Sequence, residues 1–222
     1  MDARKIRIPL DIAMTVLSVI LMGGTMLFPD DRVHQVLGML LLALWACHTV
    51  LNRRWYGSLF RGKYQPYRIM QLAVNLGISA CALLLMLSGL MMAWFLPFDV
   101  GGGIGFARTA HLVGSHWYYL FMCAHLGMHA GMILGKILKG KRLPVLPRLI
   151  IALACAYDVY AFIVRGIGKY LFLRQQFFFF DLDRGILLFV ADYLAILVLF
   201  ATAAHWLGKL LLSAGKRKPG GA

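Results

Sequence analysis

The sequence predicts an all-α integral membrane protein, a helical bundle of about six transmembrane helices. Of its 222 residues, 61% are hydrophobic and only 14% are charged, whereas a soluble domain normally has about a quarter of its residues charged. A helix needs about 20 largely apolar residues to cross a hydrocarbon core of roughly 30 Å, and six runs approach that length. These runs cover residues 8–28, 33–51, 70–96, 110–135, 147–164 and 186–211.

Basic residues predict how the helices are oriented. The net charge of +14 comes mainly from four clusters beside the apolar runs, so membrane topology explains it and we do not expect nucleic-acid binding. By the positive-inside rule the clusters lie in the cytoplasm, which puts both termini there and predicts a multi-pass membrane protein. The clusters are Arg4, Lys5 and Arg7; Arg53, Arg54, Arg61, Lys63 and Arg68; Lys136, Lys139, Lys141, Arg142 and Arg148; and Lys209, Lys216, Arg217 and Lys218.

One segment, residues 165–184, departs from this charge pattern. It should lie outside, yet it contains four basic residues together with many aromatic ones. A mixture of this kind is typical of a helix or hairpin that lies at the level of the lipid headgroups. We therefore expect an interfacial segment between the last two spans, which together occupy residues 147–211.

Histidines reveal an internal repeat. His34 and His48 lie fourteen residues apart in the second span, and His111 and His125 repeat that spacing 77 residues later in the fourth. Each pair belongs to a predicted helical hairpin, the first at residues 8–60 and the second at 70–135. We expect the two hairpins and the C-terminal spans to form a single membrane domain over residues 1–222.

The spacing places both histidines of a pair on one helix face. Fourteen residues turn a helix through about 1400° and advance it by roughly 21 Å. The second and fourth spans run parallel, so His34 should lie level with His111 and His48 level with His125. One iron can bind between the two imidazoles at each level, as in a b-type haem held in a bundle core. The sequence thus predicts two non-covalent b-type haems in a four-helix core.

Two other interpretations of the histidines are less favoured. A single intramembrane histidine is often only hydrogen-bonded across helices, but four at matched spacing and depth indicate function because ionisable groups are costly there. A zinc or copper site would favour carboxylates or thiolates at the same depth. The four cysteines form neither a CxxC nor a CxxCH pattern, which disfavours disulfides, iron-sulfur clusters and c-type haem.

Further residues could contribute to haem binding. Gly38 and Gly114 leave room for a planar ligand near the backbone, or serve tight helix packing. Arg53 could pair with a haem propionate, although a basic residue is expected there for topology. His129 lies one turn beyond His125 and could replace it as ligand, but only His125 repeats the 77-residue offset, so we favour a propionate contact for His129.

A set of motifs is spread along the sequence: His34 to Gly38, His48 to Trp55, His125 to His129, Tyr157, Ala161-Phe162, Arg165-Gly166, Phe178 to Asp181, and Asp192 to Ile196. These motifs resemble a family of bacterial membrane proteins that is catalogued as a domain of unknown function and related to cytochrome b-type electron carriers. The resemblance covers nearly the whole chain. It implies a haem-binding helical bundle of the bacterial inner (cytoplasmic) membrane, associated with flavoproteins in electron transfer. Asp158 is a departure, because a glycine is expected after the tyrosine.

A haem bound by two histidines has no open coordination position, which favours electron transfer over substrate activation. We expect a cytochrome b subunit, rather than a stand-alone oxidoreductase, that contacts lipid and passes electrons between a quinol or flavoprotein and an exported acceptor. One alternative is a quinol dehydrogenase or ferric reductase with Asp158 and Asp192 as proton acceptors, although we prefer an exposed carboxylate at a span end for Asp158. The other alternative is a non-redox transporter of metal or haem.

Overall fold

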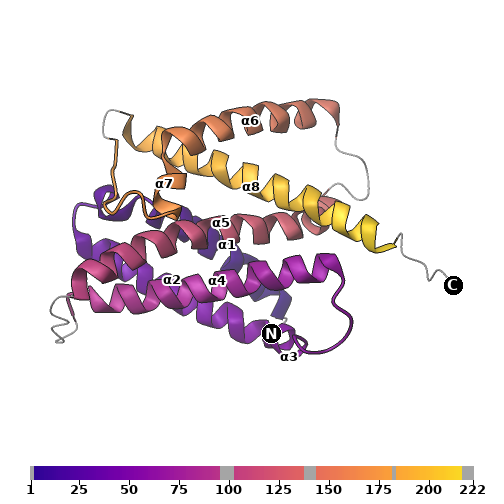
Figure 1. The fold of residues 1–222 in the computed structure, drawn as a ribbon, viewed down its shortest axis with the longest axis horizontal. Helices are drawn as coiled ribbons and strands as arrows, with labels where there is room; N and C mark the ends of the chain where they lie inside the picture. Colours follow the sequence, from indigo (N-terminus) through magenta and orange to yellow (C-terminus); the bar gives the residue numbers. More distant parts are fainter. Residues whose placement is uncertain (1–2, 96–102, 138–143, 182–183, 217–222) are drawn as a thin grey trace. The chain divides into compact units, whose positions relative to one another are not determined.

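A computed structural model describes residues 3–95, 103–137, 144–181 and 184–216. Every regular element in these residues is helical (Figure 1). Prolines and small polar residues mark where helices begin: Pro66 starts α4, and the Asp30 side chain accepts a hydrogen bond from the Arg32 backbone at the start of α2. The elements are α1 (Ala3–Leu21), η1 (Gly24–Leu27), α2 (Asp31–Leu51), α3 (Arg53–Gly57), α4 (Pro66–Met91), α5 (Gly103–Ile137), α6 (Val145–Val164), α7 (Ile167–Leu171) and α8 (Gly185–Lys216).

The all-α class is confirmed, and the six predicted apolar runs coincide with α1, α2, α4, α5, α6 and α8. Within the described residues, four helices are long and apolar enough to cross a membrane: α2, α4, α6 and α8. Helix α1 falls outside that set because Arg4, Lys5, Arg7 and Asp11 interrupt it, and α5 because four histidines lower its hydropathy. Six membrane crossings therefore stay a prediction.

Parts of the predicted loops lie outside the described residues. This holds for residues 96–102, which join the third and fourth apolar runs, and for residues 182–183 of the interfacial segment. It also holds for several residues of the basic clusters, namely Lys139, Lys141, Arg142, Arg217 and Lys218.

The described residues form two compact units, and α4, α5 and α8 each contribute to both. The first unit comprises Met1–Gly62, Ala80–His116 and Lys169–Val190. In it, α1 packs against α2 as a helical hairpin. Arg7 near the start of α1 donates a hydrogen bond of 2.7 Å to the carbonyl of Leu51 at the end of α2, so the two helices run antiparallel.

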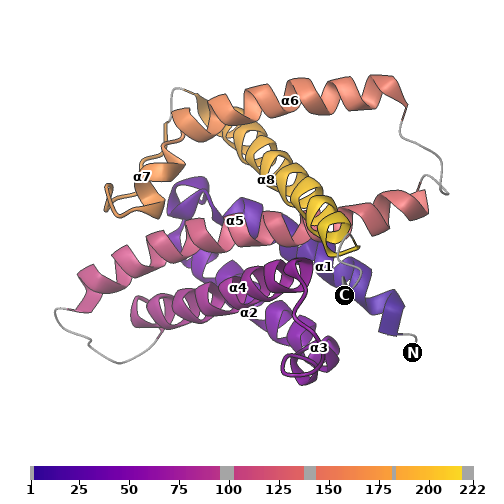
Figure 2. The ribbon, with the colours of Figure 1, turned by 45° about the vertical axis from the view of Figure 1, so that its right-hand side comes forward.

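The second unit comprises Lys63–Ser79, Trp117–Gly168 and Ala191–Ala222. Its α5 and α8 segments approach so closely that a Cβ atom at Gly127 would overlap the carbonyl oxygen of Ala201, while one at Gly131 would lie 3.0 Å from the His205 ring. Glycines four residues apart on one face allow such close packing of apolar helices. Helices α6 and α8 converge at the C-terminal end of α6 and diverge toward its start (Figure 2).

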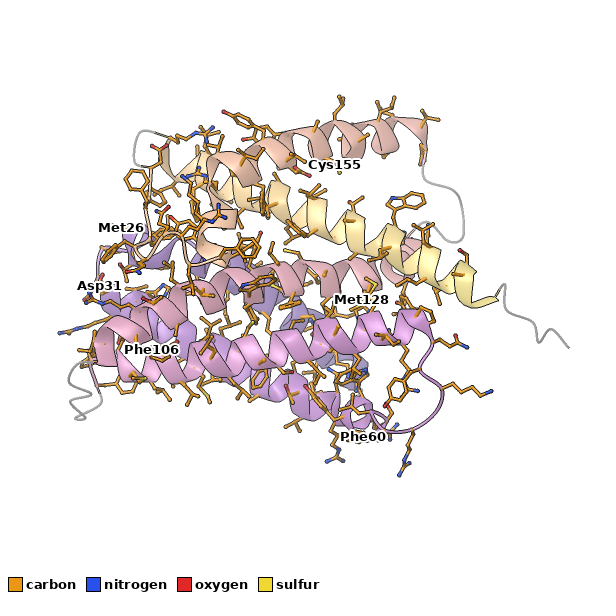
Figure 3. The ribbon with its side chains drawn as sticks, viewed as in Figure 1. Met26, Asp31, Phe60, Phe106, Met128 and Cys155 are labelled. Atoms are coloured by element: carbon orange, nitrogen blue, oxygen red, sulfur yellow. The ribbon has the colours of Figure 1, made fainter. Side chains whose placement is uncertain are left out.

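Large apolar side chains point outward along the helices. Phe106, Leu153 and Leu187 are 71%, 72% and 87% exposed, and Figure 3 shows Phe106 projecting away from the helices around it. Exposed apolar surface of this extent is unusual for a soluble monomer. It indicates contact with lipid, in agreement with the four apolar helices.

The predicted interfacial segment has no helix long enough to span a membrane among residues 165–181, where α7 is five residues long. Within the first unit its aromatic residues are partly buried: the Tyr170 ring stacks on His116 at 4.4 Å between centroids, and Phe178 contacts the ring of Tyr170. A Cβ atom at Gly24 would lie 3.3 Å from Phe178. The segment therefore packs on its own unit, and its position at the headgroups stays a prediction.

Candidate haem-ligand site

The structure brings two of the predicted ligands together in the first unit. His34 on α2 and His111 on α5 lie with ring centroids 6.2 Å apart and ring planes at 67°. Seventy-seven residues separate them in the sequence. Their convergence therefore results from the packing of two helices and not from local chain geometry.

This spacing suits two axial ligands of one iron. An imidazole nitrogen binds a first-row metal at about 2.0–2.1 Å, so two rings on opposite sides of the metal place their centroids about 6 Å apart. Zinc needs four ligands, and among the described residues no three His, Cys, Asp or Glu side chains gather as a metal site. Haem iron needs only two protein ligands, so the residues present fit haem better than a free metal ion.

The contacts of His111 fix the position of its ring proton. The Ser88 hydroxyl on α4 donates to the carbonyl of Leu84 at 2.7 Å and lies 3.2 Å from Nδ1 of His111. Since its proton is used by Leu84, the hydroxyl oxygen accepts from Nδ1–H, which puts the lone pair of the ring on Nε2. Gly89 makes room for this ring, because a Cβ atom there would lie 3.6 Å from Cε1 of His111.

His48 has a support of the same kind from α1. Its Nδ1 lies 2.8 Å from Oδ1 of Asp11 in the first unit. A carboxylate oxygen accepts, so Nδ1 donates and Nε2 carries the lone pair. A hydrogen bond from the second ring nitrogen to a carboxylate orients most metal-bound histidines.

In the second unit, His125 repeats the arrangement with an amide. Its Nδ1 lies 2.8 Å from Oδ1 of Asn75 on α4, so Nδ1 donates here too. The ring of His129 lies 4.7 Å from that of His125, tilted by 59°. His125 and His129 are therefore neighbours one turn apart, as the sequence predicts, and His125 has the type of support seen at His48.

Asp11 and Asn75 occupy corresponding places in the two predicted hairpins. Each lies on the first helix of its hairpin, and each accepts a hydrogen bond from the second histidine of the other helix. The duplication thus extends from the histidines to the groups that orient them. His34 is the exception, because its Nδ1 is buried and has no hydrogen-bond partner among the described residues.

The remaining predicted site residues differ in their surroundings. A Cβ atom at Gly38 would meet nothing within 4 Å, whereas one at Gly114 would lie 3.2 Å from Leu84. Gly38 therefore borders open space, and Gly114 permits close packing with α4. Arg53 begins α3 and is exposed. His48 and His125 belong to different units, and their pairing stays a prediction.

A second polar cluster lies between α6 and α8 in the second unit. Asp192 is fully buried, accepts a hydrogen bond from the Tyr157 hydroxyl, and pairs with Nε of Arg165 at 2.7 Å. Asp158 is 1% exposed. The preferred interpretation of Asp158 as an exposed carboxylate is therefore wrong, because its side chain turns inward from α6 rather than toward the end of the span.

Several residues of the site were not predicted from the sequence. Asp11, Asn75 and Ser88 are polar residues within apolar runs, and such residues usually have a function or a partner. Gly127 and Gly131 form a GxxxG pattern, which predicts close helix packing. These signals were available, but no spacing in the sequence connects Ser88 or Asn75 to a particular histidine.

No family model matches the chain, and no curated protein or solved structure matches it.

Proposed function

We propose that the chain is a membrane cytochrome b that holds two non-covalent haems and carries electrons across the bacterial inner membrane. The observation that carries the proposal is the approach of the His34 and His111 rings to 6.2 Å within one compact unit. The resemblance to cytochrome b-related proteins of unknown function agrees with it, and membership of that family is part of the proposal.

Two axial pairs follow from the duplicated spacing. His34 and His111 would hold one haem, and His48 and His125 the other, with Gly38 and Gly114 beside the histidines and Arg53 or His129 near propionates. The haems would supply reversible one-electron reduction of iron. A haem held by two histidines would favour electron transfer over substrate activation.

The protein's own contribution is to orient the histidine rings and to exclude water from them. Asp11, Ser88 and Asn75 support Nδ1–H of three histidines, which directs Nε2 toward the ligand and makes the ring a better electron donor. The apolar helices around the histidines keep water away, and this lowers the rearrangement that accompanies a change of charge.

One observation favours a substrate site in addition to the two proposed haem sites. Asp158 and Asp192 place two buried carboxyl groups in the second unit, where they would exchange protons with a bound quinol. A flavoprotein or exported acceptor would then complete the chain of electron transfer. Oxidation of reduced protein by added quinone distinguishes a quinol-oxidising enzyme from a subunit that only relays electrons.

The visible spectrum of the protein purified in detergent tests the proposed function. We expect the bands of low-spin, six-coordinate haem at two haems per chain. Protein that stays colourless after expression with ample haem supply, and that does not take up added haem, would contradict both redox functions and favour a transporter.

A further inference from the structure

A buried carboxyl group that electron transfer does not use lies inside α6. Asp158 is 1% exposed, and neither of its carboxyl oxygens has a hydrogen-bond partner among the described residues. It lies six residues before α6 ends at Val164, well inside a helix that is long and apolar enough to span a membrane.

Neighbouring residues on α6 show which way Asp158 faces. Arg165, seven residues later and thus on the same helix face, reaches Asp192 of α8. Cys155, one turn earlier, lies close to Thr202 of α8, and Figure 3 labels Cys155 on the side of α6 toward α8. Ala161, between Asp158 and Arg165, is fully buried. Asp158 therefore faces α8 between two polar contacts.

No positive charge faces Asp158 from the described part of α8. Between Asp192 and Thr202 this helix is apolar except for Tyr193, whose carbonyl accepts a hydrogen bond from the Tyr119 hydroxyl of α5. The other titratable groups of the cluster are Cys155 and Tyr157 on α6 and Tyr119 on α5, and none of these carries positive charge. Arg165, which follows the last residue of α6, is hydrogen-bonded to Asp192.

An isolated carboxylate in such surroundings costs several kcal/mol, and in practice the group keeps its proton instead. Two carboxyl groups of one cluster then differ: Asp192 is paired with Arg165, whereas Asp158 keeps its proton. Pairs of this kind often divide acid and base roles.

We propose that Asp158 is a proton-binding site inside the second unit, a carboxylic acid that holds its proton at neutral pH. The site gives the chain a group that can donate a proton to a bound molecule, or accept one again, without carrying a charge in the resting state. The proposal does not depend on haem, because it rests on the contacts between α6 and α8 alone.

Infrared difference spectroscopy between the wild-type protein and the Asp158→Asn variant tests the site. We expect loss of the carbonyl band of a protonated carboxyl equivalent to one group per chain, and retention of that band in the matched Asp192→Asn variant. Asp158→Glu should shift the band rather than remove it. Loss of carboxylate bands instead would overturn the proposal.

A second measurement needs no variant. Dicyclohexylcarbodiimide adds to protonated carboxyl groups in apolar surroundings and can be located by mass spectrometry of peptides. At neutral pH we expect the labelled fraction at Asp158 to exceed that at Asp192, which is paired with Arg165. Labelling at Asp158 no greater than at Asp192 would contradict the proposal, whatever the haem content of the sample.

Discussion

His34 and His111 lie edge to face, with ring centroids 6.2 Å apart, on two helices that each carry a second histidine fourteen residues further on. The proposed haem site depends on this relationship. It joins helices from both halves of the internal repeat, so changes to either helix should affect the same cofactor.

Ser88→Ala should weaken haem binding at the His34–His111 level. The hydroxyl accepts the hydrogen bond that orients His111, and loss of such a support typically lowers affinity about 10–100-fold. Haem retention during titration with a competing haem acceptor measures the change. Ser79→Ala is the matched control on α4, because its hydroxyl bonds only a backbone carbonyl of its own helix in the described structure. Equal haem loss in both variants would refute the role of Ser88.

Asp11→Ala should weaken the binding of haem by His48 in the same way, whereas Asp11→Asn should retain most of the binding. The amide keeps an oxygen that accepts from Nδ1, as Asn75 does for His125, but lacks the charge. We therefore expect Asp11→Asn to raise the reduction potential of that haem, since a nearby negative charge stabilises the oxidised iron. A potentiometric titration monitored in the visible region gives both results. A variant Asp11→Asn that behaves like Asp11→Ala would contradict the proposed hydrogen bond.

His125→Ala should remove one haem, whereas His129→Ala should leave both haems low-spin and six-coordinate. The two rings are close neighbours, at 4.7 Å between centroids. Asn75 orients His125 in the manner of a ligand, and His125 is the one that repeats the 77-residue offset. Spin state and haem content of the two variants decide the assignment. The opposite pattern would make His129 the ligand.

Gly127→Ala should destabilise the second unit by about 1–3 kcal/mol, the usual cost of adding a methyl group to a packed contact. The new Cβ atom would overlap the carbonyl oxygen of Ala201, and backbone cannot move aside as a side chain can. Gly105→Ala on the same helix is the control, because nothing lies within 4 Å of its Cβ position. Thermal unfolding in detergent measures both, and equal stability of the two variants would contradict the packing.

The helices could be predicted from the sequence because apolar runs of sufficient length have few alternatives in a bilayer. Their ends were less predictable. The first run was expected to continue to residue 28, but the left-handed backbone at Gly24, with φ +61°, accompanies a turn into η1 after α1 ends at Leu21. Such a turn depends on local backbone geometry, which hydropathy does not report.

The candidate site could be predicted in part. The fourteen-residue spacing identified four histidines on shared faces, and the structure brings His34 and His111 together. The sequence could not reveal that Asp158 turns inward, because the rotation of α6 about its own axis depends on how it packs against α8. Nor could the spacing connect Arg165 to Asp192, because the two lie 27 positions apart with a helix and an irregular segment between them.

The most direct test of the account compares haem content in the single variants His34→Ala and His111→Ala with the double variant. If both side chains bind one iron, each single variant should fall from two haems per chain to one, and the double variant should fall no further, because the second removal affects a site that is already lost. Loss of two different haems in the single variants, or of both haems in the double variant, would contradict the shared site.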